Sequence, residues 1–112
     1  MKKLLVVWKS DNKIDIDNFI MPFAYNSKNQ GWFDDVEILI WGSSQKKVAS
    51  ELVYQDKVKE LIGEGIRIFA CKWCADNVGV TKMLESLGVN VMYTGVYLSD
   101  KLKDPNYEVI TI

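Results

Sequence analysis

Short runs of apolar residues recur along the chain at the length of β-strands. Five of them are rich in β-branched or aromatic side chains, at residues 3–8, 36–41, 66–70, 89–93 and 107–112. The first two are almost continuously apolar, which is typical of strands that helices cover on both faces. The last run alternates, with Glu108 between Tyr107 and Val109, so we place it at an edge of a sheet.

The segments between these runs have helical periodicity. The first is marked by apolar side chains at Ile16, Phe19, Ile20, Phe23 and Ala24. Pro22 lies inside it, so either the helix begins only a few residues before the proline or the axis kinks there. The segment after Gly42 predicts a loop, a short helical turn and a longer helix that ends at Gly63 and Gly65. Two further helices are expected within residues 80–87 and 96–102.

Strand and helix therefore alternate along the whole chain, without repeats, linkers or low-complexity tracts. This order predicts an α/β fold with a five-stranded parallel sheet and helices on both faces, and it argues against an antiparallel hairpin among the first four strands. We expect one domain over residues 1–112, because domains usually occupy about 100 to 150 residues. The sequence leaves the order of the strands in the sheet open.

The charge balance narrows the function classes. Fourteen basic and 15 acidic residues give a net charge of -1, so no electrostatic excess favours nucleic acid or an anionic membrane surface. The apolar run at the N-terminus stops at Lys9, too early for a signal peptide, and no apolar stretch approaches the ~20 residues that span a bilayer. We therefore expect a cytoplasmic protein.

In parallel α/β folds the carboxyl ends of the strands open onto the ligand crevice. The residues expected there, besides the two cysteines, are candidate crevice-lining positions: Ser10, Trp41, Gly42, Ser43, Lys72, Trp73 and Thr94. Gly42 and Ser43 could hold an anion through backbone N–H groups, but the segment has no phosphate-loop pattern. A turn followed by a helix N-cap is the simpler interpretation of these two residues.

The most distinctive chemistry is the Cys71-Lys72-Trp73-Cys74 segment after the third apolar run. Backbone N–H groups at a helix start, together with Lys72, would favour the thiolate of Cys71, which is the nucleophilic form. Cys74 follows about one helical turn later, close enough for a local disulfide or a sulfur transfer. We expect Cys71 to be the more nucleophilic thiol. The alternative is that both cysteines are small buried hydrophobic residues beside Trp73.

Other cysteine chemistry is disfavoured. A thioredoxin-type dithiol would follow an early strand and face a cis-proline, and neither Pro22 nor Pro105 is an obvious candidate. The chain has no histidine, so two thiolates would leave a zinc ion half-ligated and a Cys–His catalytic pair is excluded within one chain. No metal or other cofactor is expected.

The chain resembles the small DsrE-like proteins, whose relatives include the DsrE/DsrF and YchN sulfur-relay subunits. The resemblance is carried by residues 4–8 with Ser10, 21–26, 31–32, 40–42 and above all 71–80. It implies a three-layer α/β/α sandwich of flavodoxin- or Rossmann-like type and assembly into trimers or hexamers. It also implies a persulfide-carrying cysteine at the end of the third strand with a glycine eight residues later, a spacing that Cys71 and Gly79 match.

The leading hypothesis is a sulfur carrier, a sulfurtransferase-like relay protein rather than an enzyme of ordinary turnover. Cys71 would hold sulfane sulfur as a persulfide and Cys74 would resolve or relay it, with the chain itself and a sulfur donor or acceptor protein as partners. Two alternatives stay open: a non-catalytic homo-oligomeric binding or scaffold domain, and a dithiol redox sensor.

Overall fold

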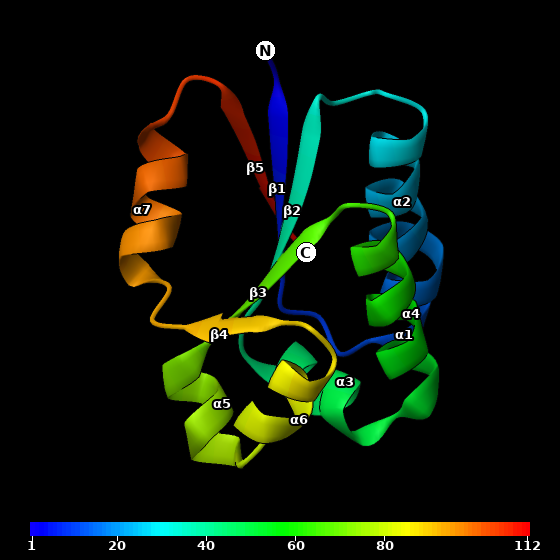
Figure 1. Ribbon diagram of the computed structural model, residues 1–112, viewed down its shortest axis with the longest axis vertical. Helices are drawn as coiled ribbons and strands as arrows, with labels where there is room; N and C mark the ends of the chain where they lie inside the picture. Colours follow the sequence, from blue (N-terminus) through cyan, green and yellow to red (C-terminus); the bar gives the residue numbers. More distant parts are fainter.

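A single five-stranded sheet forms the centre of the molecule. The computed structural model describes all 112 residues, and Figure 1 shows the strands side by side with helices around them. The strands are β1 (Lys3–Trp8), β2 (Asp35–Ile40), β3 (Arg67–Cys71), β4 (Asn90–Met92) and β5 (Tyr107–Thr111). All pairings are parallel, in the order β4-β3-β2-β1-β5. The predicted parallel α/β fold is confirmed, and β5 lies at an edge.

The helices lie in every connection between consecutive strands. They are α1 (Lys13–Asp15), η1 (Ile16–Ile20), α2 (Met21–Asn29), α3 (Ser43–Ser50), α4 (Leu52–Gly63), α5 (Lys72–Val78), α6 (Thr81–Ser86) and α7 (Gly95–Lys103). None of them is long and apolar enough to cross a membrane.

The first connection accommodates Pro22 without a break in the helical path. Helical structure begins at Lys13, where the Asn12 side chain accepts from the backbone N–H groups of Ile14 and Asp15. The segment just before the proline is the π-helical η1, and Pro22 stands in the first turn of α2. A π-turn changes the local hydrogen-bond pattern, so the helix continues past a residue that has no N–H to donate.

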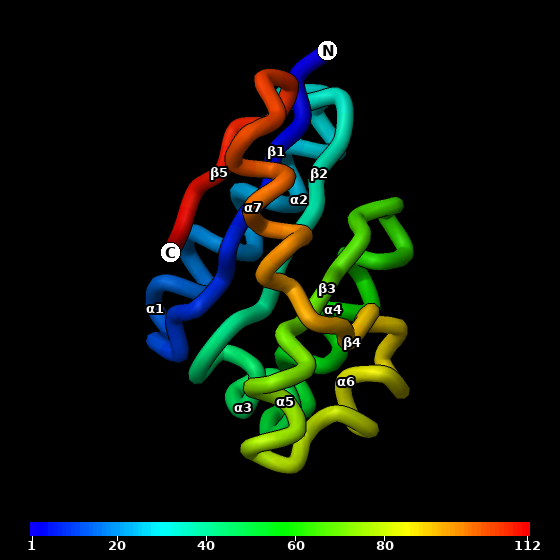
Figure 2. The backbone as a smooth tube through the Cα atoms, turned by 90° about the vertical axis from the view of Figure 1, so that its left-hand side faces the viewer, coloured from blue at the N-terminus to red at the C-terminus, as the bar shows by residue number.

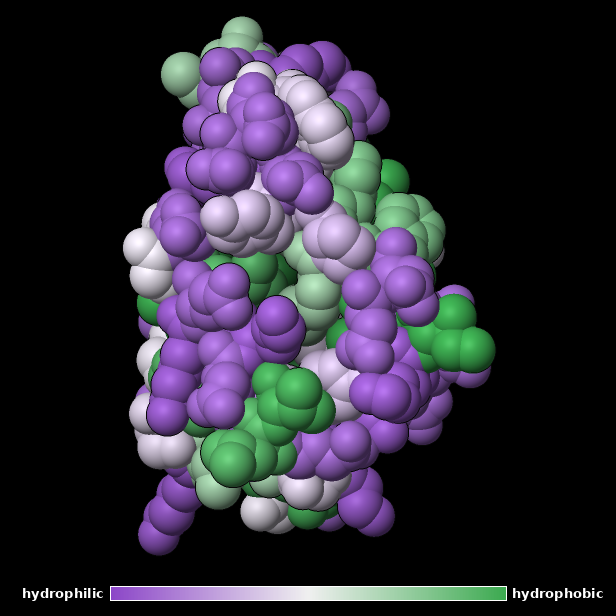
Figure 3. Space-filling view, turned by 90° about the vertical axis from the view of Figure 1, so that its right-hand side faces the viewer, coloured by the Kyte–Doolittle hydropathy of each residue, from purple (hydrophilic) through white to green (hydrophobic).

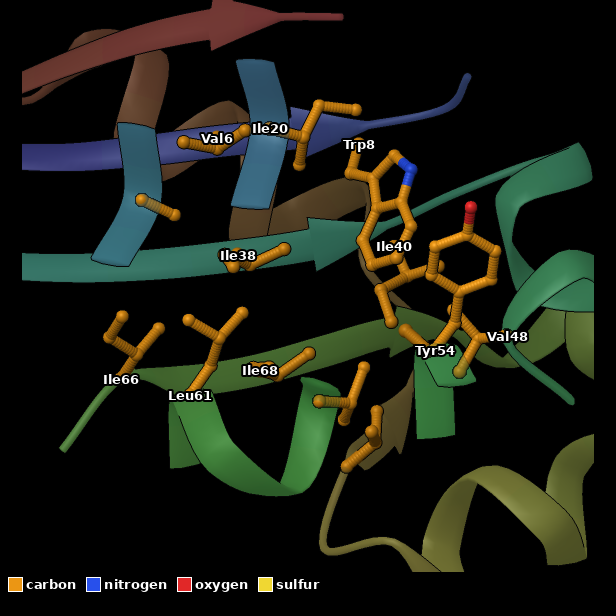
Figure 4. Packing of buried hydrophobic residues seen from close by; sticks show 14 of the residues in the cluster. Val6, Trp8, Ile20, Ile38, Ile40, Val48, Tyr54, Leu61, Ile66 and Ile68 are labelled. Atoms are coloured by element: carbon orange, nitrogen blue, oxygen red, sulfur yellow. The ribbon is translucent and has the colours of Figure 1, made fainter. Parts of the chain in front are cut away.

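The two faces of the sheet differ in how they are covered. Alternate residues such as Val6, Ile38 and Ile68 face the larger core, which continues to the carboxyl ends of β1 and β2, where Trp8 lies beside Tyr54 (Figure 4). The residues between them, which include Leu5, Val7, Leu39 and Phe69, face a smaller cluster. Figure 2 shows α7 lying across this second face. The result is a three-layer α/β/α arrangement.

The helices that cover the larger core, which include α2 and α4, have a mainly hydrophilic outer surface. Figure 3 shows that this side carries separate small hydrophobic groups among hydrophilic side chains, rather than one continuous apolar patch. Exposed apolar residues such as Leu52 and Val53 lie at the start of α4. The outer faces of these helices are therefore typical of helices that are in contact with water.

The helix after Gly42 is longer than the sequence predicted. The segment after Gly42 was expected to be a loop with a short helical turn, but Ser43–Ser50 is an eight-residue helix. Gly42 begins it with a backbone φ of 78°, a conformation that residues with a Cβ rarely adopt. The segment is mostly polar, so its sequence has little of the apolar periodicity by which a helix is recognised.

Candidate functional site

Cys71 lies where β3 passes directly into α5. It is the last residue of the strand, paired with Met92 of β4, and it is also the N-cap residue of the helix, with an extended backbone. This is the strand-end position that the sequence predicted. Its exposed fraction is only 5%, however, so the thiol is largely shielded from solvent.

Cys74 lies in the first turn of α5 and is partly exposed. Both cysteines are free thiols, and the Cys71 side chain is close enough to Cys74 to act on its ionisation. The sequence led us to expect the more nucleophilic thiol at Cys71, whereas the structure gives the greater solvent access to Cys74. The reason is local: Cys71 still belongs to the sheet and is covered like its neighbours, whereas Cys74 lies on the helix beyond the sheet edge.

The pKa of the Cys74 thiol is raised above its usual range. Burial of the sulfur is the largest cause, and the neighbouring Cys71 side chain raises this pKa further. The Gly42 backbone N–H and the Trp41 side chain act in the opposite direction, because they stabilise the thiolate. Cys74 is therefore mainly a protonated thiol near neutral pH, and it must lose a proton to become a nucleophile.

Cys74 opens onto a pocket of about 570 Å³ between α3 and α5. The two helices lie beside each other past the carboxyl ends of the strands, at the lower end of the molecule in Figures 1 and 2. The pocket is lined by Asp11, Gly42, Ser43, Lys46, Lys47, Ser50, Trp73, Cys74, Asn77 and Val78. A cavity of this size is within the usual range for small-molecule sites, about 300 to 1,000 Å³.

Buried side chains of α3 fix this wall of the pocket to the sheet. The Ser44 hydroxyl donates to the Trp8 carbonyl at 2.5 Å. The fully buried Gln45 amide donates to the carbonyls of Ile40 and Cys71, at 3.0 and 3.1 Å. Because Gln45 bonds to the ends of both β2 and β3, it ties α3 directly to the backbone that carries the first cysteine.

The pocket contains charges of both signs. Lys47 pairs with Glu51 at 2.6 Å, but Lys46 and Asp11 take part in none of the ion pairs within the chain. Both lie on the exposed surface of the pocket. The site therefore offers a bound molecule one cation, Lys46, and one anion, Asp11, that belong to no ion pair, and, besides Glu51, Asp11 is also close enough to Lys47 to raise the pKa of that lysine.

Only part of the predicted crevice comes together around Cys74. Gly42, Ser43 and Trp73 line the pocket, and the Trp41 side chain acts on the Cys74 thiol.

Three other candidates lie outside the pocket lining. Ser10 donates from its hydroxyl to Asp15 at 3.2 Å and accepts from the Asn12 backbone. Lys72 pairs with Asp76 at 2.9 Å, so its charge is partly neutralised rather than reserved for a thiolate. Thr94 is buried before α7, and its hydroxyl has no hydrogen-bond partner.

The residues that the sequence did not predict are mainly on α3. Lys46, Lys47 and Ser50 line the pocket from a segment that was interpreted as loop and turn. Gln45 was also missed, because a single glutamine in a polar stretch gives no sign that it will be buried. Recognising the helix would have placed Ser43, Lys46, Lys47 and Ser50 on one face by their spacing of three to four residues.

Comparison with known proteins found no matching family model and no matching curated protein. Among solved structures, a conserved protein of unknown function from Bacteroides thetaiotaomicron, BT1422, is 37% identical. The match covers 99% of this chain and 95% of that chain, with a TM-score of 0.95. Likeness at this identity over nearly the full length of both chains shows common family membership.

Two more distant structures share the fold over the full length of both chains. The YchN protein from E. coli has a TM-score of 0.80 at 16% identity. MTH1491 from Methanobacterium thermoautotrophicum, a protein of unknown function, has a TM-score of 0.72 at 19% identity. The complete coverage shows that this chain shares the fold of both structures over all of its described residues.

Proposed function

This chain shares a family with BT1422 and the fold of YchN, and from that premise we propose that it is a DsrE/YchN-like cytoplasmic sulfur carrier that holds sulfane sulfur as a persulfide on its cysteine pair. One observation carries the proposal. Two free thiols lie next to each other at the carboxyl edge of the sheet, Cys74 open to a pocket and Cys71 shielded from solvent. A carrier needs one thiol that meets the donor and a protected position for the reactive sulfur.

Sulfur enters at Cys74 and is held on Cys71. The Cys71 thiolate attacks the outer sulfur of a Cys74 persulfide, so that a new S–S bond forms on Cys71 while the S–S bond to Cys74 breaks. Cys74 leaves as a thiolate and takes up the proton that Cys71 lost. No net oxidation occurs, and the step needs no further reactant. The burial of Cys71 then protects the persulfide from thiols in solution.

The test is sulfur loading followed by mass spectrometry of the intact protein. After incubation with a sulfane-sulfur donor, the wild type should gain one sulfur atom that cyanide removes. Cys74→Ser should load much more slowly, because only the shielded thiol remains. Cys71→Ser should load but lose its sulfur faster to added dithiothreitol. If the wild type gains no sulfur, the sulfur-carrier proposal is wrong.

A dithiol redox sensor is the second function that the same adjacency favours. Cys71 is the N-cap residue and Cys74 lies three residues later, so a local disulfide would close within one helical turn. Mild oxidation without a sulfur donor would then remove two hydrogen atoms from the protein without adding sulfur. Rapid disulfide formation together with failure to take up sulfane sulfur would select this function over the carrier.

Self-association belongs to the same proposal. Three large apolar side chains, Tyr93, Val96 and Leu102, are each more than 60% exposed. They lie on or beside β4 and α7, which face the viewer in Figure 2. Contact between copies of the chain would remove this apolar surface from water. We propose a homo-oligomer, with trimers or hexamers as the expected states.

A further inference from the structure

We propose that the pocket beside Cys74 binds a small zwitterionic persulfide of peptide size, and that this molecule is the sulfur donor. The inference rests on the proposed sulfur-carrier function and adds the chemical class of the donor. Three features of the site support it: the volume of the pocket, the charges in its wall and the position of the Cys74 thiol.

The volume favours an organic donor. The pocket holds about 570 Å³, so an inorganic sulfur anion such as thiosulfate would fill only a small part of it. Trp73 and Val78 form an apolar part of the wall, and both side chains are at least half exposed. A ligand with a carbon skeleton would cover this apolar surface, whereas a small anion would leave it in water.

The charges favour a zwitterion. Lys46 and Asp11 line the same pocket, and neither has an ion-pair partner in the chain. A ligand with a carboxylate and an ammonium group can pair with both. A dianion would be attracted by Lys46 and repelled by Asp11. The Asn77 amide lines the pocket as a hydrogen-bond partner for a peptide backbone. The hydroxyls of Ser43 and Ser50 donate to the carbonyls of Lys9 and Lys46, and their remaining lone pairs can accept from the ligand.

The thiol position defines the reaction. Cys74 loses its proton, and its thiolate attacks the outer sulfur of the donor R–S–SH. The S–S bond of the donor breaks as a new S–S bond forms on Cys74. The electron pair of the broken bond leaves on the donor's inner sulfur as R–S⁻, which takes up a proton to give R–SH. The balance is R–S–SH plus Cys74–SH giving R–SH plus Cys74–S–SH, with no net change of oxidation state.

The experiment compares glutathione persulfide, as the zwitterionic probe, with thiosulfate in loading the wild-type protein. We expect glutathione persulfide to load Cys74 at lower half-saturating concentration. Lys46→Ala should raise that concentration about two- to fivefold, the range expected for one exposed ion pair. Asp11→Asn should weaken the use of glutathione persulfide and improve that of thiosulfate. Lys59→Ala, an exposed lysine on α4 outside the pocket, is the matched control and should change neither.

A second measurement tests binding without sulfur transfer. S-methylglutathione has the same carboxylate and ammonium groups and no reactive sulfur, so it should slow the alkylation of Cys74, and more in wild type than in Lys46→Ala. Loading from thiosulfate with no preference for glutathione persulfide, and no protection by S-methylglutathione, would overturn the donor class while leaving the carrier function standing. Failure of every donor to load sulfur would overturn the carrier function itself.

Discussion

The side-chain amide of Gln45 donates a hydrogen bond of 3.1 Å to the backbone carbonyl of Cys71. The same nitrogen donates to the carbonyl of Ile40 at 3.0 Å, and the glutamine is completely buried. One side chain on α3 therefore hydrogen-bonds to the carboxyl ends of two neighbouring strands, β2 and β3. These strands lead into α3 and α5, which form the two walls of the pocket. The geometry of the cysteine pair depends on a residue that has no part in sulfur chemistry.

Replacing Gln45 by methionine should destabilise the protein by about 1 to 3 kcal/mol, because two buried carbonyls lose their donor at nearly constant side-chain volume. Urea denaturation followed by circular dichroism measures the change. Gln30→Met is the control, since Gln30 is exposed and its side chain makes no hydrogen bond within the chain. Equal stability of the two variants would show that Gln45 does not hold the strand ends.

A buried carboxylate fixes α7 to the opposite face of the sheet. Glu37 is 1% exposed and accepts hydrogen bonds from the Tyr97 hydroxyl at 2.6 Å and from the Tyr107 hydroxyl. It also forms an ion pair with the Arg67 guanidinium at 3.3 Å. Tyr97→Phe should cost about 1 to 3 kcal/mol, because a buried charged acceptor loses a donor. The same denaturation measurement applies, with Tyr25→Phe on the outer helix layer as the control. A change in Tyr97→Phe no larger than in the control would contradict this role.

The same cluster predicts loss of stability in alkali. Burial, followed by the hydrogen bond to Glu37, raises the pKa of Tyr97 and of Tyr107 far above their usual value. In the unfolded chain these groups ionise at about pH 10, whereas the folded protein keeps their protons. The contribution of the two protonated hydroxyls to the free energy of unfolding is therefore complete below that pH, and it decreases as the pH rises through it.

Denaturation at pH 8 and pH 10.5 measures this loss. Lysines and Cys74 with raised pKa values act in the same direction, so the informative comparison is with Tyr97→Phe. That variant should lose less stability than the wild type between the two pH values. Identical losses would mean that Tyr97 does not contribute to the pH dependence.

The fold could be predicted from the sequence because its signals are local and strong. Continuous apolar runs such as residues 4–8 and 38–41 occur in strands covered on both faces, and the helical segments between them require parallel crossovers. The order of the strands could not be predicted, because periodicity does not encode which strands are neighbours. The π-turn before Pro22 could not be predicted either, because the apolar pattern allowed both a helix that begins only a few residues before the proline and a helix whose axis kinks there.

The site was predicted less completely, for a physical reason. Strand ends can be located from apolar runs, so Cys71, Gly42 and Ser43 were placed correctly at the carboxyl edge. Which of two thiols is exposed depends on packing by distant segments, and the pattern gave no measure of it. Lys46 and Gln45 differ completely in burial although they are adjacent in a polar stretch, and only the helix geometry separates them.

Self-association predicts a sedimentation result. The protein should sediment as a homo-oligomer at micromolar concentration. Val96→Asp should shift it toward smaller species, because Val96 is 74% exposed on α7 and a charge there opposes apolar contact. Glu60→Lys, on the outer face of α4, changes charge on the hydrophilic layer and serves as the control. A wild-type protein that remains a monomer would contradict the proposal.

The ionisation of Cys74 should respond in opposite directions to its two neighbours. The Cys71 side chain raises the pKa of Cys74, and the Trp41 side chain lowers it. Cys71→Ala should therefore move the pH midpoint of Cys74 alkylation downward, and Trp41→Phe should move it upward. The midpoint is measured from rates of iodoacetamide reaction at several pH values, with the labelled position identified by peptide mapping.

Because the thiolate is the reacting form, sulfur loading should follow the same midpoint in each variant. Cys71→Ala should then load Cys74 faster than wild type near neutral pH, although it lacks the holding thiol. A midpoint that does not move in either variant would show that neither neighbour controls the thiol. A downward shift in alkylation without faster loading would place the slow step after proton loss, in the attack on the donor.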